Sequence, residues 1–225
     1  MLDYSNQAMW SNNFGQSQSP IHLDSKKAVV HNRQNLPVSF HGAYNLDVEY
    51  NDHTTIRLTG DGFANIFNRP FNFKQVHFHA PAEHTIDDKK FPFEIHMVHQ
   101  NSIGQSVVVS LLPNLGDPNN DLQEIIDNFD ENKNKPVNIN IPSWLPKRAN
   151  GFHYLGSLTT PPLSEGIEWV IITNPSLTVS QEQVNWFKQQ FGTNNRDLQP
   201  DNGRLVELYY QEVKPIHKNL NQQFR

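Results

Sequence analysis

The segment from Phe71 to His99, FNFKQVHFHAPAEHTIDDKKFPFEIHMVH, restricts the fold of this chain more than any other feature of the sequence. His77 and His79 are two positions apart, and in a β-strand residues at i and i+2 point from the same face. After the turn-like APAE and the polar DDKK, a second apolar run places Glu94 and His96 on one face by the same period. We therefore expect the two runs to pair as antiparallel strands, with three imidazoles converging on one point.

Three imidazoles without a cysteine are typical of a catalytic zinc site. Zn²⁺ is bound tetrahedrally, and three protein ligands leave the fourth position for water, whereas structural zinc sites are closed by four protein ligands. A lone histidine on a strand is more often a core or surface residue than a ligand, but here Gln75 and Glu94 lie two residues before His77 and His96. Such neighbours can accept the second ring N–H of a ligand and fix its tautomer. The sequence therefore predicts a zinc site formed by His77, His79 and His96, with Gln75 and Glu94 behind it.

The other histidines are interpreted as non-ligands. His84 follows a proline-containing turn, and His99 falls on the strand face opposite to His96. Three more histidines lie among the turns of the first third of the chain and are expected to be surface or structural residues: His31, His41 and His53.

Four separate motifs together resemble the α-class carbonic anhydrases of the bacterial type. They are Gln-x-His-x-His, Glu-His-Thr, Glu-x-His-x-Val-His and, far downstream, Ser-Leu-Thr-Thr-Pro-Pro at 157–162. The resemblance extends from Tyr4 to about Arg204. It implies a mostly-β fold in which residues 1–225 form a single domain around a large, twisted, mainly antiparallel central sheet with a few short helices. It also implies that the zinc lies at the bottom of a cone-like cleft.

The same resemblance implies the reaction, the reversible hydration of CO₂ to bicarbonate and a proton through a zinc-bound hydroxide. Thr159 would donate its hydroxyl proton to Glu83 and accept the proton of the bound hydroxide, since a hydroxyl donates and accepts at once. The residues that the resemblance places in the substrate pocket are Val98, Val108, Leu158, Thr160 and Trp169.

Two other functions are compatible with these motifs. One is a carbonic-anhydrase-like binding module that no longer catalyses; loss of a metal histidine would indicate it, and all three histidines are present. The other is a zinc esterase, because a zinc hydroxide attacks any accessible carbonyl. Cleavage of esters compared with hydration of CO₂ distinguishes the esterase from the carbonic anhydrase.

Composition excludes several classes of partner and bears on the cellular location. A net charge of −5 over 225 residues gives no electrostatic footprint for nucleic acid or an anionic membrane. No apolar stretch approaches the roughly 20 residues that span a bilayer. We expect a small-molecule partner, CO₂ or bicarbonate, and the sequence leaves open whether the chain forms a homodimer. The absence of cysteine and of a basic, then apolar, N-terminal segment favours a cytoplasmic protein; a periplasmic or secreted protein with its signal peptide removed is the alternative.

The sequence departs from the family pattern at three places: the disulfide, the proton relay and the 204–225 tail. Bacterial members commonly carry a disulfide where this chain has Phe14 and Leu163, and we expect apolar packing to replace it. The histidine that relays protons in the family is also missing at the aligned position, where Gly62 is followed by Phe63 and Ala64. Turnover is therefore expected to be limited by buffer.

Periodicity predicts the remaining elements. Short strands are expected over 29–67, separated by turns such as the Gly-Asp-Gly break at 60–62, and the apolar run 105–112 is expected to lie in mid-sheet. One helix is predicted to begin at Asp117-Pro118, and a second at the capping box of Ser180, ending at Gly192. The role of the 204–225 tail is open, an interface strand being one possibility.

Overall fold

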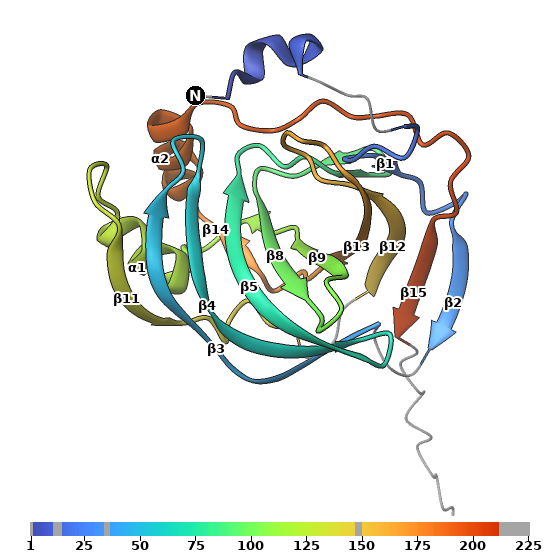
Figure 1. The fold of residues 1–225 in the computed structure, drawn as a ribbon, viewed down its shortest axis with the longest axis horizontal. Coiled ribbons are helices and arrows are strands. Elements are labelled where there is room, and N and C mark those ends of the chain that lie inside the picture. The colour runs from blue at the N-terminus through green and yellow to red at the C-terminus, as the bar shows by residue number, and fades with distance from the viewer. Residues whose placement is uncertain (1, 11–14, 34–36, 147–149, 212–225) are drawn as a thin grey trace, which may run out of the picture.

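One large β-sheet dominates the protein (Figure 1). The computed structural model describes residues 2–10, 15–33, 37–146 and 150–211. The ten strands of the sheet are β2 (Val29–Arg33), β3 (Val38–Asn51), β4 (Ile56–Ile66), β5 (Arg69–His79), β8 (Glu94–Gln100), β9 (Ser106–Leu111), β11 (Lys135–Asn140), β12 (Asn150–Ser157), β13 (Glu165–Thr173) and β15 (Glu207–Gln211). Their order is β11-β3-β4-β5-β8-β9-β13-β12-β15-β2. Within this sheet β9 pairs with β13 and β2 with β15 in parallel, and the other neighbours are antiparallel. The expected mostly-β, mainly antiparallel fold is confirmed.

The smaller elements lie around this sheet. They are the 3₁₀ helix η1 (Tyr4–Met9), the helices α1 (Asn120–Asn128) and α2 (Gln181–Phe191), and the two-residue strands β1 (His22–Leu23), β6 (Thr85–Ile86), β7 (Lys89–Lys90), β10 (Asn114–Leu115) and β14 (Thr178–Val179). The strands β1, β6 and β7 form one small sheet, and β10 pairs with β14. No helix in the described part of the chain is long and apolar enough to cross a bilayer.

The two helices differ in how well the sequence predicted their starts. The helix α2 begins after Ser180, whose hydroxyl accepts from the backbone N–H of Gln183 in a complete capping box, as expected. The predicted start of α1 at Asp117-Pro118 is wrong, because Asn119 is the N-cap and its Oδ1 accepts from the backbone N–H of Leu122 at 3.0 Å. The same oxygen also accepts from Trp144 Nε1 at 2.9 Å, and this distant contact fixes the cap.

The alternation of side chains along β5 separates an apolar core from the histidines. Val76 and Phe78 point into the main core, where the Phe78 ring lies 5.3 Å from the Phe187 ring of α2. His77 and His79 therefore point from the opposite face. Because burial of Phe78 under α2 fixes which face is covered, a one-residue slip of register would bury the histidines in the core instead.

The glycines of the Gly-Asp-Gly segment lie inside a strand, which corrects the prediction of a break there. The long strands β3 and β4 pair with each other in this part of the chain. The register between β4 and β5 shifts between Thr59 and Phe63, where these glycines lie. A Cβ on Gly62 would lie 2.5 Å from the ring of Tyr44, so the buried tyrosine requires glycine at this position. Gly62 is thus a packing glycine rather than a turn glycine.

The structure describes part of the tail and part of the region where the family carries its disulfide. The tail contributes β15, which lies inside the sheet between β12 and β2, while residues 212–225 are outside the described residues. Phe14 also lies outside the described residues, but Leu163 is buried. The described link between these segments is polar: Glu165 Oε1 accepts from the backbone N–H of Ser17 at 2.5 Å, and Gln18 Nε2 donates to the carbonyl of Leu163 at 3.1 Å.

Candidate metal centre

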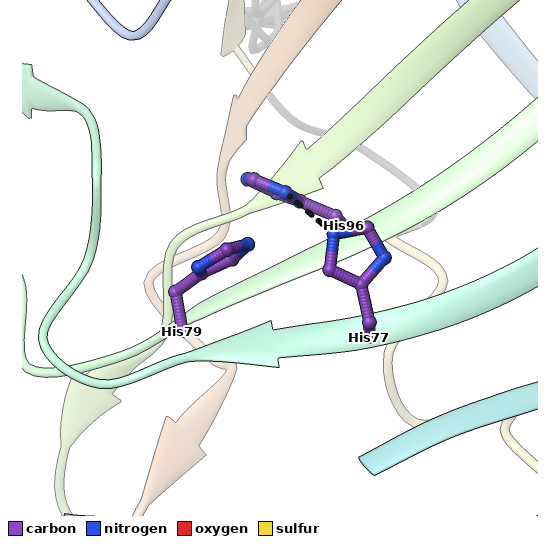
Figure 2. A group of neighbouring side chains, drawn as sticks. All are labelled: His77, His79 and His96. Atoms are coloured by element: carbon purple, nitrogen blue, oxygen red, sulfur yellow. Dashed lines mark hydrogen bonds between the residues drawn. The ribbon is translucent and has the colours of Figure 1, made fainter. Parts of the chain in front are cut away.

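Three histidines from two neighbouring strands converge at one point. His77 and His96 are partners in the β5–β8 ladder, and His79 lies two residues further along β5. Their side chains point toward one another (Figure 2), with His77 Nε2 3.2 Å from His96 Nδ1. One ring nitrogen from each of the three lies within 4.8 Å of the others. The predicted strand pairing therefore brings together the three residues that sequence analysis proposed as ligands.

Each of these histidines uses its other ring nitrogen for a contact with the protein. The contacts are His77 Nδ1 to Gln75 Oε1 at 3.0 Å, His79 Nδ1 to the carbonyl of Asn194 at 2.8 Å, and His96 Nε2 to Glu94 Oε1 at 2.8 Å. Carbonyl and carboxylate oxygens accept hydrogen bonds, so each outer nitrogen carries the proton and each inner nitrogen keeps its lone pair. Three lone pairs directed at one point are the arrangement that a metal ion needs.

Burial supports the neutral form of these imidazoles. Burial lowers the pKa of His77 well below its usual value, and the charges of His96, His79 and Arg57 lower it further. Burial also lowers the pKa of His79 and of His96. His79 Nε2 is buried and has no hydrogen-bond partner among the described residues. A buried nitrogen without a partner is costly unless a ligand occupies it, and a metal that accepts three nitrogen ligands fits this site.

Asn194 orients His79 and was missed by sequence analysis. Its carbonyl accepts from His79, its Oδ1 accepts from the backbone N–H of Ala80 at 2.8 Å, and its Nδ2 donates to the carbonyls of Thr54 and Phe78. Asn194 lies three residues beyond α2 and 115 residues from His79. No local pattern predicts such a contact, because it depends on where α2 docks.

Glu94 lies behind His96 and is fully buried. Its Oε2 accepts from the backbone N–H groups of Glu83 and His84 at 2.7 and 2.9 Å, and its Oε1 accepts from His84 Nδ1 at 2.7 Å, from His96 Nε2 at 2.8 Å and from Ser110 Oγ at 2.6 Å. Burial acts to raise the pKa of Glu94, but His84 and His96 outweigh it and hold the pKa well below its usual value.

A second group of possible metal ligands shares residues with the first. His84, Glu94 and His96 also bring ligand atoms within 4.8 Å of one another. His84 Nδ1 and His96 Nε2 both face Glu94, and the other nitrogen of His84 lies 2.7 Å from the hydroxyl of Tyr154. These atoms are already engaged in hydrogen bonds, so His84 matches the interpretation as a non-ligand. His99, as expected, lies away from the site, with contacts to Tyr44 and the carbonyl of Met97.

Glu83 and Thr159 are both buried beside the histidines. The backbone N–H of Arg196 donates to Glu83 Oε1 at 2.8 Å, and Oε2 lies 4.0 Å from His96 Nε2. Burial raises the pKa of Glu83, and the Thr159 hydroxyl directed at this carboxylate partly opposes the rise. In the described structure Glu83 Oε2 nevertheless lacks a partner with good hydrogen-bond geometry. The pairing of Thr159 with Glu83 stays a prediction.

Three of the expected pocket residues form a row across the sheet. Val98 pairs with Val108 in the β8–β9 ladder, and Val108 pairs with Trp169 in the β9–β13 ladder. The centre of the Trp169 ring lies 4.9 Å from that of His96. The other two, Leu158 and Thr160, flank Thr159 in the turn after β12 and are half-buried. An apolar wall thus lies next to the histidines.

The two residues at the position where the family carries its relay histidine lie on β4. Phe63 pairs with Asn72 at the far end of the β4–β5 ladder, and Ala64 is buried in the main core. The residue of β4 opposite His77 is Arg57, which lies six residues before Phe63. Phe63 thus lies opposite a residue five positions before His77, and the expectation that turnover is limited by buffer stays a prediction.

Comparison with known proteins agrees with this geometry. The family model described as eukaryotic-type carbonic anhydrase matches residues 5–213. A carbonic anhydrase of Pectobacterium atrosepticum is 35% identical over 198 residues, 85% of this chain and 80% of the relative. The α-carbonic anhydrase of Thermovibrio ammonificans, solved with the inhibitor sulfanilamide, is 34% identical and superposes with a TM-score of 0.78. The match covers 86% of this chain and 87% of that structure's chain.

A further solved structure shows that similar folds also hold other ligands. Dioscorin, solved in complex with ascorbate, has a TM-score of 0.80 and 27% identity, covering 88% of each chain. The family match over residues 5–213 and the bacterial relatives nevertheless agree with each other and with the three histidines. The chain belongs to the α-carbonic anhydrase family, the eukaryotic-type family whose relatives here include bacterial carbonic anhydrases.

Proposed function

We propose that this protein catalyses the reversible hydration of CO₂ to bicarbonate and a proton with one Zn²⁺ held by His77, His79 and His96. Family membership supports the carbonate dehydratase activity. The observation that supports this metal site is that the two nitrogens of each imidazole ring face different partners. Each outer nitrogen faces an acceptor from the protein, and each inner nitrogen faces the same point.

The metal supplies Lewis acidity, for which carbonic anhydrases are the standard example: a water molecule at such a centre has a pKa near 7, against 15.7 in bulk water. The residues of this chain would provide the rest. Glu83 carries an acceptor next to the Thr159 hydroxyl, and that hydroxyl would orient the attacking oxygen by donating to Glu83 and accepting from the oxygen. Gln75, Glu94 and Asn194 would hold the rings in place.

The apolar row of Val98, Val108 and Trp169 matches the chemistry of the substrate. CO₂ has no net charge or dipole and offers little to hydrogen-bond, so a polar wall would hold water more readily than CO₂. The row lies beside His96, where the substrate would have to bind before it reacts. The half-buried Thr160 would give the product bicarbonate a polar contact.

The test combines metal analysis with two assays on the same preparation. We expect one zinc per chain, CO₂ hydration that is lost on chelation and regained with zinc, and weaker ester cleavage. Ester cleavage that exceeds CO₂ hydration would support a zinc esterase instead. A protein that binds small ligands but accelerates neither reaction would support a binding module.

We also propose a cellular location and an interface for a dimer. We infer a cytoplasmic location, because a chain without cysteine needs no oxidising compartment; fractionation of the native source tests it, with the periplasm or secretion as the alternative. A homodimer would use an exposed sheet edge, and the edge strand β2 leaves Val29 and Val30 about half exposed. Sedimentation at several protein concentrations distinguishes monomer from dimer.

A further inference from the structure

The strand β9 contains one polar residue among buried apolar ones. Its sequence is SVVVSL, and the side chains from Val107 to Leu111 are all buried. Ser110 lies at the position of β9 that pairs with His96 on β8. Its hydroxyl makes one hydrogen bond, to Glu94 Oε1 at 2.6 Å. A fully buried hydroxyl in the middle of an apolar strand thus contacts the carboxylate that orients a metal-binding histidine.

We propose that Ser110 is a positioning residue that weakens the hydrogen bond from His96 to Glu94. The inference rests on the proposed metal site. Glu94 Oε1 accepts from three donors at once, His84 Nδ1, His96 Nε2 and Ser110 Oγ. Donors to one oxygen compete, because each withdraws electron density from the lone pairs that the others use. The Ser110 hydroxyl therefore lengthens the hydrogen bond between His96 and Glu94 compared with a site that has an apolar side chain in place of Ser110.

The effect passes from Glu94 to the metal-facing nitrogen of His96. A strong acceptor behind a ligand histidine raises the basicity of that ligand. The Ser110 hydroxyl weakens the hydrogen bond from His96 to Glu94, so His96 Nδ1 would donate less electron density to a bound metal. The metal would then be a stronger Lewis acid than in a protein without this hydroxyl. A role in packing alone predicts the opposite, because removal of the hydroxyl would then loosen Glu94 and with it His96.

The test uses Ser110→Ala, with Ser110→Cys as an intermediate because a thiol is a weaker donor. In the metal-free protein, the proton on His96 Nε2 should move downfield in the NMR spectrum as its bond to Glu94 shortens. In the zinc-loaded protein, release of zinc to a chelator should become about two- to fivefold slower, less than the 10–100-fold effect of losing an outer partner itself. The midpoint of the pH–rate profile should move to higher pH.

Ser106→Ala is the matched control, since Ser106 lies on the same strand and contacts Gln100 rather than Glu94. It should leave all three readouts unchanged. Faster zinc release from Ser110→Ala, or an unmoved or upfield His96 proton, would overturn the proposal and leave Ser110 a packing residue. The NMR readout needs neither zinc nor turnover, so it separates a failure of this inference from a failure of the proposed function.

Discussion

His77 Nε2 lies 3.2 Å from His96 Nδ1, and the two residues are directly paired across β5 and β8. Directly opposite residues of an antiparallel pair have their Cβ atoms about 4.5–5.5 Å apart. Two imidazoles in these positions can reach one ion without any change of backbone. The ladder itself therefore determines the geometry of the candidate metal centre.

The first prediction concerns that pair. His96→Ala should lose zinc and CO₂ hydration together, because it removes one of three protein ligands. Elemental analysis and a hydration assay on one preparation measure both. The control is His99→Gln on the same strand, which faces Tyr44 rather than the site and should keep its zinc. Full zinc occupancy in His96→Ala would exclude His96 as a ligand.

The second prediction concerns Glu83, which is buried next to the histidines but is proposed to orient the Thr159 hydroxyl rather than the metal. Glu83→Gln should keep the zinc and lower kcat by about 10- to 100-fold, the usual range for an outer partner of a metal site. The exposed Glu131→Gln is the control. A Glu83→Gln protein as fast as the wild type would show that the pair is wrongly identified.

Residues whose role depends on strand period were predictable from the sequence. The spacings of His77, His79 and His96 specify one face of two strands, and the burial of Phe78 under α2 selects that face. The capping box at Ser180 was equally local and is confirmed. In each case the physical cause acts within a few residues, so the chain itself carries the information.

The features that sequence analysis missed depend on distant contacts. Asn119 caps α1 because Trp144 also binds its side chain, and Asn194 reaches His79 only through the docking of α2. The break expected at the Gly-Asp-Gly segment was wrong because Gly62 resembled a turn glycine. The ring of Tyr44, 18 residues away in the sequence, is the actual reason for that glycine.

The third prediction concerns Glu49, a buried carboxyl on β3 that faces Lys135 of β11. Burial raises the pKa of Glu49 to about 7, and the charge of Lys135 opposes the rise. Between the ordinary pKa near 4.5 and the folded value, the unfolded chain has released a proton that the folded protein still binds. The free energy of unfolding therefore falls as pH rises through this window and stays reduced above it.

Glu49→Gln should remove this loss and raise the free energy of unfolding above pH 7 by at most about 2 kcal/mol, allowing for screening by solvent. Below pH 4.5 the two proteins should be alike. Urea unfolding at pH 4.5, 6 and 8 measures the difference, with the exposed Glu124→Gln as control. An equal difference at every pH would contradict the assignment of the titration to Glu49.

The last prediction concerns the release of protons. A proton that leaves a group of pKa near 7 directly to water is limited to about 10²–10³ s⁻¹ by recombination at about 10⁹–10¹⁰ M⁻¹s⁻¹, so faster turnover needs a relay. The chain has Phe63 and Ala64 at the position where the family carries its relay histidine.

We expect the turnover of the wild type to depend strongly on buffer, because no histidine occupies the position of the family's relay. Imidazole-type buffer at fixed pH and ionic strength should raise the rate until the chemical step limits it. Phe63→His should raise the rate most where buffer is scarce. Ala64→His tests the neighbouring position, but it should also destabilise the core in which Ala64 is buried. Wild-type turnover that does not depend on buffer would show that another histidine of the chain relays the proton.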